Sequence, residues 1–389
     1  MKRASRLQGM AVYPFARWAG YVQAAQQRGM DVIRLDAGNP DLPPPDHVVE
    51  ALCRSAQRPE HHGYASYRGL PALRQAMASY YQRRFGVDLD PETEVLPLIG
   101  SKEGLVNLAL GCLDPGDLVL VPDPGYAPYT MGAVLAGAGV YPLPLLPERG
   151  FLPDLGAVPA EVASRAVLLW LNYPNNPTGA TADLEFYAQA VEWAQRHELL
   201  LCHDAPYCDV TYDGYVAPSI LQVPGASRVA VEFNSLSKTY NMAGWRVGMV
   251  VGNADALAAL AQVKTNVDSG LYRPLQEAAA QALSADPGWI RQRNGIYQER
   301  LEVMLQGLKA AGLEATRPRA ALYVWAQVPS PWTSEGFALG LLEGAGIALA
   351  PGSFFGPGGE GYVRLSITAP AERIREAMER LGRFAASLD

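Results

Sequence analysis

The sequence is poor in cysteine, in positive charge and in long apolar runs. Its four cysteines among 389 residues (Cys53, Cys112, Cys202 and Cys208) show no paired framework, which favours a reducing cytoplasm. The 32 Lys and Arg residues against 39 Asp and Glu residues give a net charge of -7. The excess positive charge that would attract a nucleic-acid backbone is therefore missing. The uncharged residues 131–147 are interrupted by glycine and proline, which argues against a membrane span. We therefore expect a cytoplasmic protein with no nucleic acid and no membrane as partner.

Two nucleotide-binding signatures are missing as well. The sequence has no Walker A loop, and no G-x-G-x-x-G follows a predicted strand, which argues against nucleoside triphosphates and dinucleotides. A different anion-binding arrangement is present. Val95–Ile99 predicts a strand, and Gly100, Ser101 and Lys102 lead from it into a helical pattern at Leu105. A polar turn at a helix N-terminus brings unpaired N–H groups and the positive end of the helix dipole together, which suits a phosphate.

A single lysine stands in a polar stretch that follows a short apolar run. Residues 229–233 predict a buried strand, and Ser235, Ser237, Lys238 and Arg246 come shortly after it. Partial burial beside the strand end would lower the pKa of the lysine amine and make it a nucleophile toward an aldehyde. The serines and the arginine offer the donors and charge that a phosphate dianion needs. This combination suits pyridoxal 5'-phosphate (PLP); the alternative is a solvated loop that carries these residues by chance.

Between residues 47 and 285 the sequence alternates between apolar strands and helical patterns. Strand–helix–strand order favours parallel strands, with ligands bound at their carboxyl ends. Asn176, Asp204 and Lys238 each follow the end of a strand predicted at Ala166–Leu171, Leu199–Cys202 or 229–233. The prediction is an α/β domain in which these three side chains converge at one edge of the sheet.

Asp204 ends a fully apolar strand, so we expect its carboxylate to be desolvated. A buried carboxylate needs a cation, and a protonated pyridine nitrogen would supply one while keeping the ring able to accept electrons. A metal site is the competing interpretation, because Cys202, His203 and Cys208 are close in sequence. Neighbours on a strand point to opposite faces, so Cys202 and His203 cannot both reach one ion. We therefore expect no metal.

The two ends of the chain form a second predicted unit. Residues 286–389 combine a long amphipathic helix with three strands and a closing helix, which is typical of an α+β module. The strands are predicted at Leu322–Ala326, Ile347–Ala350 and Tyr362–Ile367. The sequence thus predicts a smaller α+β domain beside the larger one.

Two residues of this unit are candidates for ligand contacts. Residues 36–45 form a rigid proline-rich connector, in which Gly38 allows a ligand to approach the backbone. Arg364 lies inside the last predicted strand, either in a structural ion pair or as a fork for a carboxylate. Its position alone favours the ion pair.

Along nearly the whole chain these motifs resemble those of the class I and II aminotransferases, PLP enzymes of fold type I. The matching residues are Tyr64 with Gly69, 100–103, 123–126, 172–179, 204–207, the stretch around Lys238, and Arg364. Within the family the sequence is most similar to LL-diaminopimelate aminotransferases, through residues 96–103 and 264–270. The resemblance implies a large PLP-binding domain of residues 47–285 with a mostly parallel sheet, and a small domain of residues 1–46 and 286–389.

The resemblance also implies roles for the residues that would hold the cofactor. Lys238 would bind PLP covalently and, once released, move the proton at the substrate carbon. Asp204 would pair with the pyridine nitrogen, Asn176 and Tyr207 would hydrogen-bond the ring hydroxyl, and Tyr126 would stack on the ring. The phosphate would be held by Ser101, Lys102, Ser235, Ser237 and Arg246.

Further implied roles concern the substrate and a second subunit. Arg364 would bind the α-carboxylate of the substrate, with Gly38 and Asn176 nearby, which replaces the ion-pair interpretation. Tyr64 would reach the phosphate in the neighbouring subunit, so the resemblance implies a homodimer with shared active sites. The substrates would be an amino acid and a 2-oxo acid, of the LL-diaminopimelate/2-oxoglutarate type used in lysine biosynthesis or of an aspartate-like type.

The far end of the substrate and two rival functions stay open at this point. Candidates for distal contacts are His61, His62, Tyr67, Arg68, Tyr13, Tyr272 and Arg273. A PLP-dependent carbon–sulfur lyase would share every cofactor residue. A non-catalytic PLP-binding regulator would need an added DNA-binding module, and the chain shows no basic helical extension.

Overall fold

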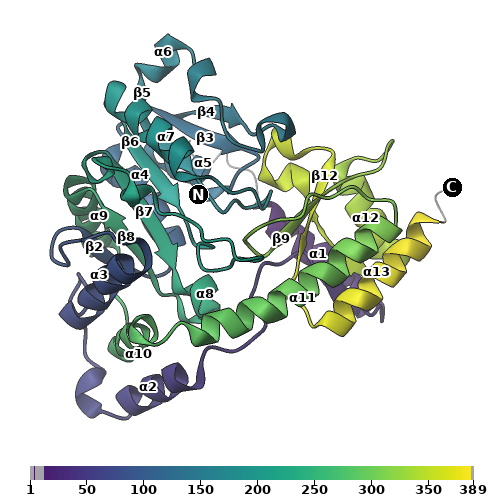
Figure 1. Ribbon diagram of the computed structural model, residues 1–389, viewed down its shortest axis with the longest axis horizontal. Helices are drawn as coiled ribbons and strands as arrows, with labels where there is room; N and C mark the ends of the chain where they lie inside the picture. The colour runs from purple at the N-terminus through teal and green to yellow at the C-terminus, as the bar shows by residue number, and fades with distance from the viewer. Residues whose placement is uncertain (1–3, 5–12, 387–389) are drawn as a thin grey trace.

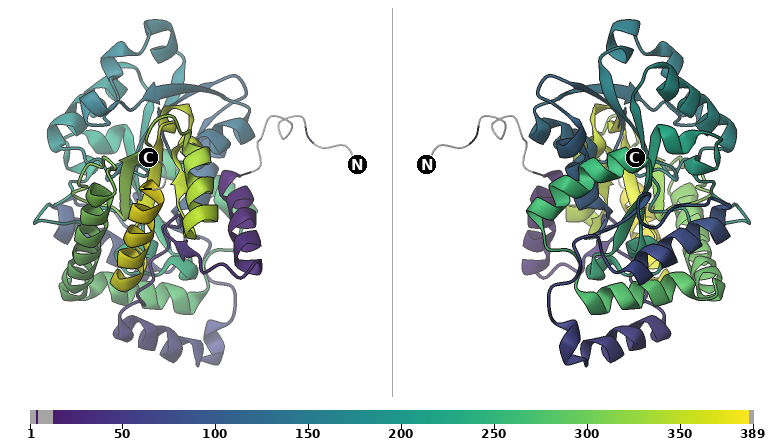
Figure 2. Two further views of the ribbon diagram at one scale, coloured as in Figure 1. Left: turned by 90° about the vertical axis from the view of Figure 1, so that its right-hand side faces the viewer. Right: turned by 90° about the vertical axis from the view of Figure 1, so that its left-hand side faces the viewer.

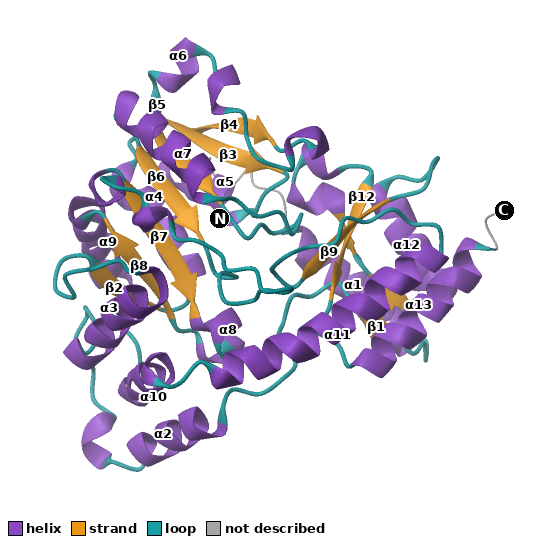
Figure 3. Cartoon of the chain, in the orientation of Figure 1, coloured by secondary structure: helices purple, strands orange, loops and turns teal. Residues whose placement is uncertain are grey.

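A seven-stranded sheet and a three-stranded sheet lie on opposite sides of the molecule in the computed structural model, which describes residue 4 and residues 13–386 (Figures 1 and 3). All neighbours in the larger sheet are parallel except β8, which is antiparallel to both β2 and β7. The predicted α/β class with a mostly parallel sheet is therefore confirmed. From edge to edge the strands are β2 (Val95–Leu98), β8 (Gly248–Gly252), β7 (Ala230–Ser235), β6 (Leu200–Asp204), β5 (Ala166–Leu171), β3 (Leu118–Asp123) and β4 (Gly139–Pro144).

The three strands that precede the candidate site residues are adjacent in this sheet. Leu171 at the end of β5 lies opposite His203 of β6, and Asp204 lies opposite Phe233 of β7. A short helix, α8 (Leu236–Thr239), follows β7 directly and carries Lys238. Because parallel strands end at the same edge, the structure brings these segments side by side, as expected. Strand β6 continues past its predicted end at Cys202 and includes Asp204 itself.

Helices cover both faces of the large sheet (Figure 2). One face packs against α4 (Ser101–Cys112), α5 (Pro128–Ala136) and α9 (Ala254–Val267). The other packs against α3 (Pro71–Phe85), α7 (Leu184–Arg196) and α10 (Arg273–Ser284), with α2 (Asp46–Ala56) outside α10 and the single-turn α6 (Ala160–Ala163) before β5. Helix α7 illustrates the local rules: Asp183 Oδ1 accepts from Phe186 N at 2.8 Å as its N-cap, and Tyr187, Val191 and Ala194 are buried at helical spacing.

The smaller unit has its own sheet and its own hydrophobic core. Its sheet, β11-β12-β9, is antiparallel, and β1 pairs with β10 beside it. Its elements are α1 (Pro14–Gln27), β1 (Ile33–Arg34), α11 (Gly288–Ala310), β9 (Tyr323–Gln327), α12 (Ser334–Ala345), β10 (Ile347–Ala348), β11 (Ala350–Pro351), β12 (Tyr362–Ser366) and α13 (Ala371–Ala385). The core of this unit draws mainly on residues 18–35 and 297–381, with a few from residues 207–212.

The division of the chain at residues 46/47 and 285/286 remains a prediction, which this separation of the cores supports. Residues 1–3 and 5–12 of the predicted small domain lie outside the described residues. Among the helices that the structure describes, none combines the length and apolar character that crossing a membrane requires.

Candidate active site

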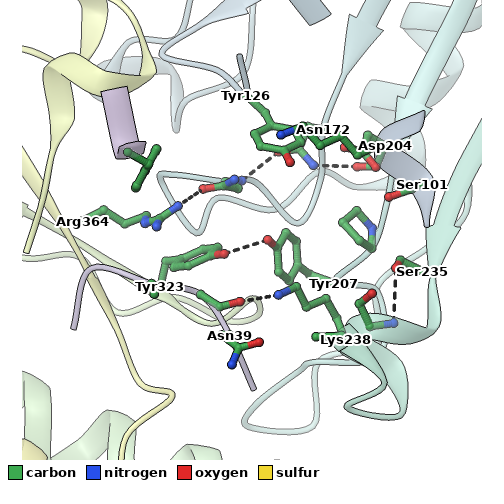
Figure 4. A pocket seen from close by; sticks show the side chains of 18 of the residues that line it. Asn39, Ser101, Tyr126, Asn172, Asp204, Tyr207, Ser235, Lys238, Tyr323 and Arg364 are labelled. Atoms are coloured by element: carbon green, nitrogen blue, oxygen red, sulfur yellow. Dashed lines mark hydrogen bonds between the residues drawn. The ribbon is translucent and has the colours of Figure 1, made fainter. Parts of the chain in front are cut away.

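A cavity of about 500 Å³ opens between the carboxyl edge of the large sheet and the smaller unit. Figure 4 shows Arg364 and Tyr323 on one side of it and Asp204, Ser101 and Ser235 on the other. Of the residues predicted to hold the cofactor or the α-carboxylate of the substrate, Tyr64 alone is not among those that line the cavity; it is 93% exposed on the surface. The others that line it are Gly38, Ser101, Lys102, Tyr126, Asn176, Asp204, Tyr207, Ser235, Ser237, Lys238, Arg246 and Arg364.

Lys238 enters the cavity from the one-turn helix α8. The Ser235 hydroxyl caps this helix by accepting from Ser237 N at 3.3 Å, which fixes where the turn begins. The Lys238 amine donates to the Gly38 carbonyl (Figure 4). Burial lowers the pKa of Lys238, and the nearby Arg364 and Arg246 cations lower it further, whereas Tyr323 acts in the opposite direction. The amine is therefore easier to deprotonate than an exposed lysine, as a nucleophile or base requires.

Positive charge and free helix N–H groups gather at one end of the cavity. Helix α4 begins at Ser101, four residues before the predicted helical pattern, and is preceded by Gly100 with φ 71°. A Cβ on Gly100 would lie 2.2 Å from Arg246 Nη2, so both the backbone angle and the close approach require glycine here. Burial, together with Arg246, lowers the pKa of Lys102. A helix N-terminus and two cations at one place suit a phosphate dianion.

Half of the Asp204 carboxylate has no hydrogen-bond partner among the described residues. Asp204 is 3% exposed; its Oδ2 accepts from the Tyr129 hydroxyl at 2.8 Å, while its buried Oδ1 accepts from none of them. Burial raises the pKa of Asp204 to about 6, against the opposing effects of Tyr129 and His203. Tyr129 is itself held by stacking on Trp170, with ring centroids 4.9 Å apart. An orphaned buried carboxylate oxygen calls for a hydrogen-bonded cation.

A chain of hydrogen bonds runs from Asp204 across the cavity to Arg364. Asn172 Nδ2 donates to the Asp204 carbonyl at 2.6 Å, and Asn172 Oδ1 accepts from Asn176 N at 2.8 Å. Asn176 Oδ1 in turn accepts from Arg364 Nη1 at 2.7 Å. The loop after β5 therefore fixes Asn176 relative to both the carboxylate and the guanidinium.

Arg364 is a buried cation held by neutral groups. It is 4% exposed, and its Nη2 donates to the Asp36 carbonyl at 2.7 Å. Its guanidinium carbon lies 4.1 Å from the ring centroid of Tyr323 and 4.7 Å from that of Phe355, while Nε has no hydrogen bond. Within residues 13–386 no carboxylate forms an ion pair with Arg364, so the structure does not support the ion pair that its position alone favoured. A desolvated guanidinium without an acidic partner can bind an incoming carboxylate.

Tyr323 is a cavity residue that the sequence did not reveal. Its hydroxyl lies 2.9 Å from that of Tyr207, and a Cβ on Gly38 would lie 2.0 Å from the same oxygen. Gly38 therefore allows the approach of Tyr323, whereas the sequence suggested the approach of a ligand. Burial raises the pKa of Tyr323, but the Arg364 and Lys238 cations outweigh this effect and lower it overall.

Tyr13, a candidate for contacts with the far end of the substrate, lines the cavity, and the other six candidates are not among the lining residues. Phe15 of the N-terminal segment lines the cavity and, like Tyr323, escaped prediction. The only signal for any of these residues was membership of a predicted strand or helix, which does not say which side chain faces a ligand.

The structure also bears on the metal interpretation. The His203 ring points away from Asp204: its Nδ1 lies 2.8 Å from Glu232 Oε2 and its Nε2 lies 3.1 Å from the Tyr173 carbonyl. In the part of the chain that the structure describes, no group of three or more His, Cys, Asp or Glu residues could hold a metal ion.

Comparisons with known proteins agree with this geometry. Residues 30–381 match the family model described as aminotransferase class I and II. A curated LL-diaminopimelate aminotransferase from Moorella thermoacetica is 49% identical over 383 residues, covering 98% of each chain. A solved structure of a probable N-succinyldiaminopimelate aminotransferase from Thermus thermophilus has a TM-score of 0.90 and 40% identity, covering 95% of this chain and 99% of that one. A single mutant of Thermus thermophilus aspartate aminotransferase has a TM-score of 0.92 and 33% identity, covering 99% and 100%.

These relatives support the aminotransferase interpretation over the lyase and regulator alternatives. The chain belongs to the class I and II aminotransferases, PLP-dependent enzymes that transfer an amino group from an amino acid to a 2-oxo acid.

Proposed function

We propose that this enzyme moves the amino group of LL-diaminopimelate to 2-oxoglutarate, as a step of lysine biosynthesis in the cytoplasm. The observation that carries the proposal is full-length similarity: curated relatives that are 46–49% identical over at least 97% of the chain are named LL-diaminopimelate aminotransferases. An aspartate-like donor is the alternative, which the 33% identical aspartate enzyme favours.

The cavity residues fit PLP at each of its charged or reactive ends. The orphaned Asp204 Oδ1 suits a protonated pyridine nitrogen, because a buried carboxylate is stabilised by a hydrogen-bonded cation. The start of α4 with Ser101, Lys102, Ser235, Ser237 and Arg246 suits the phosphate. Four further cavity residues complete the fit: Lys238 would supply the amine for the aldehyde, Tyr126 would stack on the ring, and Asn176 and Tyr207 would hydrogen-bond the ring hydroxyl.

We assign the chemical steps to three side chains. PLP, when bound, supplies an aldehyde for the amino group and a ring that accepts electrons from the substrate carbon. Arg364 binds the α-carboxylate of the donor, which orients the Cα–H bond for transfer. Lys238 Nζ accepts the proton from Cα, and its lowered pKa favours this role because the amine gives up its own proton more easily. Asp204 stays ionised against the pyridine nitrogen and thereby keeps the ring positively charged.

Arg364→Lys should keep the charge and lose the planar fork. A guanidinium grips a carboxylate through two parallel hydrogen bonds, whereas an ammonium is a single point charge. Since breaking such a buried pair costs about 2–5 kcal/mol, kcat/KM should fall by about 10² or more for every α-amino acid. The absorbance band of bound PLP should stay unchanged, and Arg317→Lys, an exposed ion-paired arginine, serves as control. A loss confined to dicarboxylic donors would move Arg364 to the distal end, and unchanged kinetics would return it to a structural role.

The proposal includes a homodimer whose two active sites are shared. Tyr64 is 93% exposed, and Tyr67, Val267 and Tyr272 are 52%, 68% and 40% exposed. These side chains stand on two segments that touch each other: Tyr272 Oη lies 3.3 Å from His62 Nδ1, and a Cβ on Gly270 would lie 3.1 Å from the Ser66 carbonyl. Apolar and aromatic side chains gathered on one surface favour an interface. Tyr64 would then complete the phosphate site of the partner.

Mixed dimers test the sharing of sites. Lys238→Ala and Tyr64→Phe chains should each be impaired alone, whereas random mixing should restore about a quarter of native sites, because each hybrid dimer regains one site with both residues. The measurement is the activity of the mixture after subunit exchange, with each variant incubated separately as control. Activity that is merely the average of the two parents, or a fully active monomer in sedimentation, would contradict shared sites.

A panel of donors tests the proposed substrate. Purified enzyme is mixed with LL-diaminopimelate, aspartate or other amino acids, and the conversion of the PLP absorbance band to that of the amine form is followed. We expect the fastest conversion with LL-diaminopimelate and reversal by 2-oxoglutarate. Fastest conversion with aspartate would establish the alternative donor, and release of pyruvate with ammonia would indicate a lyase.

A further inference from the structure

A buried arginine outside the cavity binds the backbone of the lysine-bearing helix. Arg293 on α11 is 2% exposed, and its Nη1 donates to the carbonyl of Lys238 and, at 2.7 Å, to that of Thr239. Its Nη2 donates to the carbonyl of Asp209 at 2.7 Å. No ion pair joins Arg293 to any carboxylate of residues 13–386. Its partners are backbone carbonyls and the side-chain oxygens of Asn241 and Asn294.

These contacts supply hydrogen-bond donors to carbonyls at the end of α8. Helix α8 has only four residues, so its last carbonyls have no intrahelical donor. A buried carbonyl without a donor is unfavourable, and a charged donor forms the stronger hydrogen bond. Burying a guanidinium away from carboxylates is itself unfavourable, and burial lowers the pKa of Arg293. A buried cation is thus used to hydrogen-bond the carbonyls of Lys238 and Thr239.

The same guanidinium joins two segments that line the cavity. Asp209 follows Tyr207 in the loop after β6, so Arg293 fixes the Tyr207 loop and the Lys238 helix relative to each other. It is held in turn by aromatic rings, with its guanidinium carbon 5.5 Å from the ring centroid of Trp289 and 5.6 Å from that of Tyr297.

Helix α11 extends the connection to the smaller unit. It begins beside α8 and ends beside α13 (Figure 1). One turn after Arg293, the Tyr297 hydroxyl accepts from Asn241 Nδ2 at 3.2 Å. Further along, Arg300 donates to Asp41 at 2.7 and 2.8 Å, in the connector whose Gly38 carbonyl meets the Lys238 amine. Residues 293, 297 and 300 are spaced to share one face of the helix.

We propose that Arg293 is a positioning residue that sets the place of Lys238 by holding the backbone of α8. Without it, the α8 turn has no donor at its C-terminal end, and the amine is no longer fixed at one distance from the aldehyde. PLP should still bind through its phosphate, because Ser101, Lys102 and Arg246 lie on other segments and Arg293 contacts α8 at the end opposite to its Ser235 cap. This inference rests on the proposed role of Lys238 as the residue that binds PLP covalently.

The test separates covalent attachment from binding. Arg293→Lys keeps a buried charge but cannot span the carbonyls of both α8 and Asp209; Arg291→Gln, an exposed position on the same helix, is the control. Each protein is saturated with PLP and treated with borohydride. Peptide mass spectrometry then gives the ratio of two fractions: PLP fixed covalently on Lys238, and PLP that was bound but is released after the treatment because it was not fixed. Since a hydrogen bond to a charged group is worth about 1.5–3 kcal/mol, this ratio should fall about tenfold or more in Arg293→Lys. Its kcat should fall more than its KM for the donor rises, and the control should match wild type.

The outcomes are distinct. A folded Arg293→Lys protein with a wild-type ratio and kcat overturns the proposal, even if it unfolds at a lower temperature. If Arg293→Lys does not fold, Asn294→Ala replaces it, because Asn294 Oδ1 accepts from Arg293 Nη2 at 2.7 Å and orients it. A smaller fall in the same ratio is then expected, and no fall overturns the proposal. Labelling of another lysine in wild type would refute the proposed role of Lys238 and leave Arg293 a structural residue.

Discussion

Lys238→Ala should give a folded protein that still binds PLP through its phosphate, cannot be fixed to it by borohydride, and transfers amino groups at least about 10⁴-fold more slowly. The expected loss is this large because one side chain holds two functions, covalent attachment and proton transfer, and proton transfer alone is worth about 10²–10⁴. Folding should survive, since among residues 13–386 the amine donates to a single acceptor, the Gly38 carbonyl. The measurements are single-turnover absorbance with a saturating donor and mass spectrometry of the reduced protein.

Lys102 provides the sharpest control, because it is the other lysine among the cavity residues. Its ammonium lies 4.8 Å from the ring centroid of Tyr13 and 5.9 Å from that of Tyr126. Lys102→Ala should weaken PLP binding and leave borohydride labelling at Lys238. A label on Lys102 in wild type, or near-normal turnover by Lys238→Ala, would show that the lysine has been assigned wrongly.

Strand order made most of the fold, and part of the site, predictable. An apolar run that stops abruptly at a polar residue marks both a buried strand and its end, and parallel strands end at one edge. Asn176, Asp204 and Lys238 could therefore be placed together from local sequence alone. The contacts of Arg364 could not, because they depend on Asn176 and Asp36, which lie 188 and 328 positions away in sequence.

The residues that were not predicted share a physical reason. Tyr323 looks like any aromatic residue of a strand until Gly38 and Tyr207 are placed against it. Arg293 looks like one more basic residue of a long helix, because nothing local shows that its partners are carbonyls of α8. Periodicity reports which face of an element is buried, and it carries no information about which distant backbone atoms meet a side chain there.

Asp204→Asn should lower the rate of amino transfer and, near neutral pH, make the cofactor-free protein more stable than wild type. A neutral amide cannot keep the pyridine nitrogen protonated, so the ring accepts electrons less readily. Removing one partner of a buried ion pair costs about 3–5 kcal/mol, which corresponds to a loss of about 10³ in the half-reaction rate. Cofactor should remain bound through the phosphate. Near-normal half-reactions in a variant that holds PLP would reject this role.

The stability change follows from the pKa of Asp204, which folding raises from 3.8 to about 6. A group whose pKa is raised in the folded state stabilises it below the unfolded pKa, and this stabilisation is lost as the pH rises through the folded pKa. In protein stripped of PLP, wild type should therefore lose about 2–3 kcal/mol of unfolding free energy relative to Asp204→Asn between about pH 4 and pH 7. Urea unfolding of both proteins across this range measures the difference. Adding PLP should remove it, because the pyridine cation then pairs with the ionised carboxylate in wild type alone. If the unfolding free energies of the two stripped proteins change with pH in the same way, folding does not raise the pKa of Asp204, and the inference from its unpaired Oδ1 is wrong.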